Sequence, residues 1–97
     1  MHKLEIIVTP SAEEDMQNIF DFIAQDNISK AIEMIDIFEK KFDTLAMFPK
    51  SGFIKSKLIV RDVRCAVVAE HYQIIYFIKD NVLYIQRVLT GYQDIIF

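Results

Sequence analysis

Apolar residues recur at helical spacing after Thr9-Pro10 in the first part of the chain. A proline and three acids there favour a helix start, and Ser11 with Glu14 fits a capping box. The pattern predicts a helix to about Gln25 with one buried face. That face comprises Ala12, Met16, Ile19, Phe20 and Ile23.

A second helix is predicted between the polar pair Asp26-Asn27 and Pro49. Asn27 or Ser29 can cap its first turn, and Pro49 ends it. Its apolar stripe comprises Ala31, Met34, Ile35, Phe38, Phe42 and Leu45. Because only a few residues join the two helices, they should pack as an antiparallel helical hairpin.

The remaining apolar runs are rich in β-branched and aromatic residues and predict strands. These runs are Leu4–Val8, Leu58–Arg64 continuing through Cys65–Ala69, Tyr72–Ile78 and Val82–Leu89. Pro49–Gly52 reads as a turn, and the break at Lys79–Asn81 predicts a hairpin turn of about three residues. Since Tyr72–Ile78 hardly alternates, it should be a central strand covered on both faces, by the chain's own ends or by another protein.

This order of elements predicts an α+β fold: an N-terminal strand, a helical hairpin and a three-stranded antiparallel meander. Ninety-seven residues suffice for one modest core, so residues 1–97 are expected to form a single domain. The helices should pack on one sheet face through Ile19, Phe20, Ile23, Ile35, Phe38, Phe42 and Leu45.

Composition favours a protein that works in a complex. Apolar residues make up 53% of the chain, and a domain this small is not expected to hide all of them from solvent. The net charge is −3. The acids crowd the predicted helices, so the chain has no basic footprint typical of proteins that bind nucleic acid directly.

Cysteine usage and the N-terminal pattern bear on the cellular setting. Cys65 is the only cysteine, which excludes a disulfide framework and favours a small buried side chain. Thr9-Pro10 ends the first apolar run too early for a signal peptide, and no run is long enough to span a membrane. We expect a cytoplasmic protein with no cofactor and no metal.

Three arginines fall in the predicted sheet and are candidates for contacts with a target or partner: Arg61, Arg64 and Arg87. Arg61 and Arg64 are three residues apart, so on a regular strand they point to opposite faces. Arg87 either pairs with a carboxylate such as Asp94 or Asp62 or contacts another molecule.

Two further positions near strand ends carry candidate functional side chains. His71 beside Glu70 invites a general-base role, but no nucleophile or orienting group accompanies them, and a histidine at the end of a loop is the simpler interpretation. Tyr92 follows Gly91 and is a fourth candidate contact residue. The tail 95–97 is either a terminal packing plug or an exposed docking segment.

The order and spacing of several residues resemble the RelE/ParE superfamily of small bacterial toxins across nearly the whole chain. The matching positions are Pro10-Ser11-Ala12, Ile19, Ile23, Ala31, Leu45, Pro49-x-x-Gly52, Arg64, Tyr72-x-x-x-Tyr76 and Ile85-x-Arg87-Val88-Leu89-x-Gly91-x-x-Asp94. The ending from Arg87 to Asp94 is similar to the ParE branch, whose members poison DNA gyrase. The resemblance implies a plasmid-stabilisation toxin, neutralised by a cognate antitoxin, that uses Arg64, Arg87 and Tyr92 for contact or support.

Two alternatives remain open. The RelE branch cuts mRNA on the ribosome with basic side chains around the hairpin, and in such an enzyme Arg64, Arg87 and Tyr92 would be the catalytic candidates. Val68 and Gln73 stand where those enzymes commonly place arginine. Thr90 and Gln93 depart from the ParE pattern, which makes a decayed module that only binds its partner the third interpretation.

Overall fold

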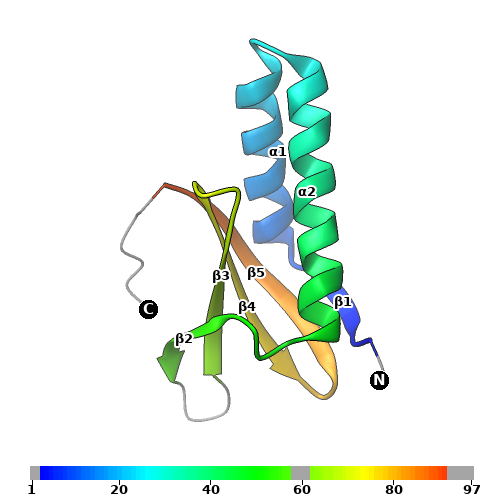
Figure 1. Ribbon diagram of the computed structural model, residues 1–97, viewed down its shortest axis with the longest axis vertical. Helices are drawn as coiled ribbons and strands as arrows, with labels where there is room; N and C mark the ends of the chain where they lie inside the picture. The colour runs from blue at the N-terminus through cyan, green and yellow to red at the C-terminus, as the bar shows by residue number, and fades with distance from the viewer. Residues whose placement is uncertain (1–2, 58–61, 92–97) are drawn as a thin grey trace.

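The computed structural model describes residues 3–57 and 62–91, which form two helices and a five-stranded sheet (Figure 1). In chain order the elements are β1 (Glu5–Val8), α1 (Pro10–Ala24), α2 (Ile28–Met47), β2 (Phe53–Lys57), β3 (Asp62–Val68), β4 (Tyr72–Lys79) and β5 (Val82–Thr90). The predicted α+β class, the helical hairpin and the antiparallel meander are confirmed.

The sheet has the strand order β1-β5-β4-β3-β2. All neighbours are antiparallel except β1, which pairs in parallel with β5 in a register that puts Ile7 opposite Tyr84. Parallel neighbours need a long crossover, and the segment between them includes the helical hairpin. The first and last strands are therefore adjacent, although they lie far apart in the sequence.

The strand count corrects the sequence prediction. The run Leu58–Arg64 was expected to open the sheet after a turn, but β2 already forms at Phe53–Lys57, and β3 begins only at Asp62. Residues 58–61 lie outside the described residues. Because β2 is an edge strand and carries lysines, it lacks the apolar alternation that marks a half-buried strand.

Side-chain caps begin both helices, one of them at an unexpected residue. Thr9, rather than Ser11, caps α1, since its hydroxyl accepts the Ala12 N–H at 3.2 Å. Proline at the next position removes a donor that would need a partner. Asn27 caps α2 as predicted, with its side-chain oxygen accepting the Lys30 N–H at 3.1 Å.

The hairpin turns use backbone with positive φ. Between β4 and β5 only Asp80 and Asn81 form the turn, with φ of 52° and 63°, so the turn has two residues rather than about three. Two consecutive positive φ values are typical of a type I′ turn, which asparagine and aspartate tolerate. Ala69 and Glu70 have similar values in the β3–β4 loop.

The main core lies between the helices and one face of the sheet. Phe38 and Leu45 have no exposed surface and Phe42 is 4% exposed, which confirms the predicted packing of α2. Phe38 meets Tyr72 edge to face at 5.2 Å between ring centroids. The consecutive residues Ile74–Tyr76 are all fully buried, as expected for a central strand.

The helical hairpin projects past the sheet. Figure 1 shows α1 and α2 side by side, with their turns near the connection rising beyond the β3–β4 loop. No described helix is long and apolar enough to cross a membrane.

Candidate functional site

Arg87 lies on β5 beyond the point where β1 ends. Its Nε and Nη2 donate to the two carboxylate oxygens of Asp15 on α1, at 2.7 and 2.9 Å. The same carboxylate accepts the backbone N–H of Val88 at 2.9 Å. Asp15 therefore binds the guanidinium bidentately and also satisfies a backbone donor that β1 no longer pairs.

The local backbone explains how Arg87 reaches a helix. The register of β5 against β4 shifts between Ile75 and Tyr76, which leaves Gln86 as an extra residue. Such a bulge redirects the side chains that follow it. Close by, the Thr9 hydroxyl donates to the Ile85 carbonyl at 2.9 Å, so the start of α1 is fixed against the same part of β5.

Arg87 remains partly available despite this pairing. Its side chain is 45% exposed, whereas that of Asp15 is only 13% exposed. The hydrogen bond with Asp15 raises the pKa of Arg87 above its ordinary value, so the cation is permanent. The carboxylate comes from α1, 72 residues earlier in the chain, and not from the expected Asp62. The other expected partner, Asp94, lies outside the described residues.

Arg64 is committed to a different place. Its Nη1 donates to the carbonyl of Gly52 at 2.8 Å and approaches that of Lys50 at 3.4 Å. Beneath it, the buried Tyr76 hydroxyl donates to the Pro49 carbonyl at 2.7 Å and accepts the Gly52 N–H at 3.0 Å. Arg64 and Tyr76 together fasten the connection between α2 and β2, a role that sequence reasoning missed.

The candidate residues do not converge in the described part of the chain. Arg64 is on β3 and Arg87 on β5, with β4 between them, a separation of about 10 Å between strand axes. Arg61 and Tyr92 lie outside the described residues. Two arginines held by separate intramolecular partners are not arranged to clamp one phosphate group.

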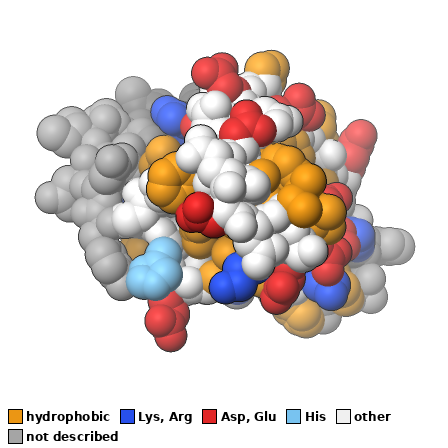
Figure 2. Space-filling model, turned by 90° about the horizontal axis from the view of Figure 1, so that it is seen from above, with side chains coloured by type: hydrophobic (Ala, Val, Ile, Leu, Met, Phe, Trp, Pro, Cys, Tyr) orange, Lys and Arg blue, Asp and Glu red, His pale blue; other side chains and the backbone are white. Residues whose placement is uncertain are grey.

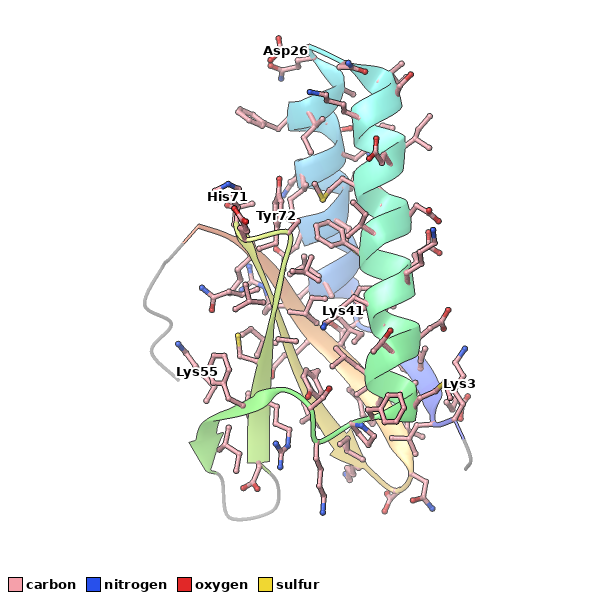
Figure 3. The ribbon with its side chains drawn as sticks, in the orientation of Figure 1. Lys3, Asp26, Lys41, Lys55, His71 and Tyr72 are labelled. Atoms are coloured by element: carbon pink, nitrogen blue, oxygen red, sulfur yellow. The ribbon has the colours of Figure 1, made fainter. Side chains whose placement is uncertain are left out.

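A hollow of about 420 Å³ lies between α1 and the top of the sheet, and His71 and Tyr72 stand beside it (Figure 3). Its lining includes Asn18, Phe22 and Thr90. His71 is exposed at a loop end, as predicted. Among residues 3–57 and 62–91 no three His, Cys, Asp or Glu side chains gather as metal ligands would.

A larger groove runs between the two helices on their outer side. It has a volume of about 690 Å³, with apolar residues Met16, Phe20, Ile32 and Ile35 in its lining. The acids that line it are Glu13, Glu33, Asp36 and Glu39. Among the residues that the structure describes, no lysine or arginine lines the groove. Figure 2, viewed from the end of the helical hairpin, shows hydrophobic side chains interspersed with acidic ones.

The apolar content of this surface continues toward the tip of the hairpin. Ile28 and Ile32 on α2 are each about three-fifths exposed. Phe22 is 75% exposed but lies on the other side of α1, beside the hollow lined by His71 and Tyr72. Large apolar side chains that share one exposed region are typical of a protein-binding surface. The groove and this tip are the strongest candidate for a partner interface in the described residues.

Comparisons with known proteins point in one direction. The family model described as "ParE toxin of type II toxin-antitoxin system, parDE" matches residues 6–95. A solved structure titled "Chromosomal ParDE TA system from P. aeruginosa" superimposes with a TM-score of 0.75 at 16% sequence identity, covering 95% of this chain and 100% of that chain. No match was found among curated proteins.

Proposed function

Since this chain belongs to the ParE family of toxins from type II toxin–antitoxin systems, we propose that it inhibits DNA gyrase by protein–protein binding. The observation that carries the proposal is the separate anchoring of Arg64 and Arg87. RNA cleavage needs groups that activate the 2′-hydroxyl and stabilise the phosphorane at a single centre. Both described arginines are instead presented singly, which suits contacts with a protein surface.

Arg87 is the residue best placed for such a contact. Asp15 fixes its Nε and Nη2, while almost half of its side chain stays exposed. A preorganised arginine loses little side-chain entropy when it binds. Arg64 supports the α2–β2 connection instead, and Tyr92 keeps its proposed contact role.

The cognate antitoxin is proposed to neutralise the toxin by laying an amphipathic helix into the α1–α2 groove. The apolar groove lining would receive the hydrophobic side chains at helical spacing. The four acidic side chains at the groove call for Lys or Arg beside those anchors. Opposite charges also steer the two proteins together at a rate that falls with salt.

Induction of the chain alone in cells tests the proposed target. Growth, the DNA damage response and transcript integrity are scored after expression is confirmed. Gyrase poisoning in the cytoplasm predicts growth arrest and DNA damage with intact transcripts. Cut transcripts without damage would support an mRNA interferase, and uninhibited growth would support an inert binding module.

Charge reversal tests the proposed antitoxin groove. Glu33→Lys with Asp36→Lys should weaken antitoxin binding at least tenfold and leave toxicity unchanged. A matched control places the same charge change on exposed residues away from the groove, as Glu5→Lys with Asp62→Lys. Equal antitoxin affinity for the two double variants would exclude the groove as the binding surface.

A further inference from the structure

The sheet face opposite the helices is buried in the middle although both helices pack on the other face (Figure 1). Val63 is 1% exposed, and Cys65 and Ile75 are fully buried. The partly buried Leu89 packs against these three residues, and it too belongs to the sheet. No described helix or strand forms a second layer on this face, the outer face of the sheet.

The outer face is apolar well beyond those three residues. Phe53 lies opposite Cys65 across the β2–β3 pair, and Val67 follows Cys65 on the same side of β3. Phe53 and Val67 are about half exposed. Phe77 and Tyr84 stack at 4.9 Å between ring centroids. An apolar surface of this extent favours a cover.

The end of β5 is hydrogen-bonded to a side chain of the outer face. Gly91 has a φ of +73°, which bends the chain out of the strand. Its carbonyl accepts a hydrogen bond from the Gln73 side chain at 3.1 Å, and the Gln73 oxygen accepts one from the Cys65 thiol at 3.4 Å. Gln73 therefore links the last described residue of the chain to Cys65 at the centre of the outer face.

We propose that residues 92–97 of this chain dock across the outer face and cover β3 and β2. Six residues span about 20 Å when extended, whereas β2 lies three strand spacings from β5, or about 14 Å. The segment contains four large apolar or aromatic residues: Tyr92, Ile95, Ile96 and Phe97. Its one charged side chain is Asp94, and Lys55 supplies a positive charge on the outer face (Figure 3).

Residues 58–61 are a less suitable cover. They connect Lys57 to Asp62, which are paired at the end of the β2–β3 ladder. A loop of four residues anchored at both ends reaches only about 7 Å from its anchors. Val67 is five residues along β3 from Asp62, about 17 Å away, so this loop does not extend over the half-exposed part of the outer face.

The single cysteine provides a direct readout of the cover. Because Cys65 is fully buried on the outer face, its rate of reaction with a thiol reagent such as DTNB reports access to that face. Ile95→Ser, Ile96→Ser and Phe97→Ser together should raise the rate at least tenfold in the purified chain, with an unchanged circular dichroism spectrum. Phe22→Ser on α1 and Ile59→Ser in the 58–61 loop serve as controls and should leave the rate within twofold.

A photo-crosslink keeps the proposal testable if the triple variant does not fold. With p-benzoyl-phenylalanine at position 97, irradiation should join the tail to β2 or β3 within one chain, at residues such as Phe53 or Val67. Thiol protection that depends on protein concentration, or crosslinks only between chains, would show a second copy as the cover. Either of these two results would overturn the proposal. It would also be overturned if only the Ile59→Ser control reacted fast, or if the triple variant folded but reacted no faster than the intact chain.

Discussion

Asp15 on α1 and Arg87 on β5 form a bidentate ion pair that also includes the backbone N–H of Val88. The pair joins the helix that follows β1 to the strand that lies beside β1, at the point where their pairing ends. A single carboxylate therefore continues the attachment of β5 past the last residue of β1. The same contact fixes the direction of the exposed Arg87 side chain.

The Asp15–Arg87 pair should show measurable coupling. In a double-mutant cycle with Asp15→Ala and Arg87→Ala, we expect about 1 kcal/mol of interaction free energy, near the upper end for a partly exposed pair. Asp15→Ala should cost more than Arg87→Ala, because it also leaves the Val88 N–H without an acceptor. Denaturant unfolding at low and high salt measures both effects, and a coupling near zero at low salt would contradict them.

Gly52 should tolerate no side chain. A Cβ there would lie 2.4 Å from the Tyr76 hydroxyl oxygen and 2.8 Å from the carbonyl oxygen of Cys65. Gly52→Ala should therefore destabilise the fold by about 1–3 kcal/mol, as overpacking does. The neighbouring exposed residue gives the control, since Ser51→Ala should stay within about 0.5 kcal/mol. Equal unfolding midpoints for the two variants would refute this packing.

Phe38 should be a main source of helix–sheet stability. It is fully buried and contacts Tyr72, so Phe38→Ala should cost about 3–5 kcal/mol. Phe22→Ala removes the same ring from an exposed position and should change stability by no more than about 0.5 kcal/mol. Thermal and denaturant unfolding compare the two, and a small loss at Phe38 would contradict the described core.

Stability should fall at alkaline pH. Burial raises the pKa of the Cys65 thiol, partly offset by Lys55. Burial also raises the pKa of Tyr76, although the Gly52 hydrogen bond and Arg64 oppose this. Below about pH 7.5 both groups are protonated in the folded and unfolded chains and contribute no pH dependence. Above it the unfolded chain loses protons first, so the free energy of unfolding decreases as pH rises.

The variants Cys65→Ala and Tyr76→Phe separate these two contributions. Each should be less stable than the parent at pH 7 but should lose less stability between pH 8 and pH 11. Cys65→Ala should flatten the dependence near pH 9, and Tyr76→Phe should flatten it above pH 10. The free energy of unfolding is measured across this pH range for the parent and both variants. Equal dependence on pH in all three proteins would contradict this assignment.

The sequence predicted the elements that have strong periodicity. Both helices and the burial of Phe38 and Phe42 followed from apolar spacing, whereas the central position of β4 followed from the lack of alternation in its apolar run. The edge strand β2 was missed, because exposed edge strands carry lysines and show little alternation. The cap at Thr9 was assigned to Ser11, since both residue types cap helices and only the backbone direction distinguishes them.

The candidate site was less accessible to sequence reasoning. Arg64 and Arg87 stand out in the sequence as cations in an apolar sheet, but their intramolecular partners are distant in the chain. Asp15 looked like one of three acids in a first helical turn, and only the placement of α1 beside β5 gives it a specific role. The Gly52 and Tyr76 contact likewise depends on tertiary structure, although both positions had been noted in the family pattern.

The most direct test of the proposed function is a supercoiling assay with purified DNA gyrase, relaxed plasmid and the purified chain. The account predicts that the chain inhibits supercoiling in proportion to its concentration, that Arg87→Ala weakens the inhibition at least tenfold, and that prior addition of the antitoxin restores activity. Unchanged supercoiling at a large excess of folded chain, together with cleavage of mRNA on programmed ribosomes, would contradict it.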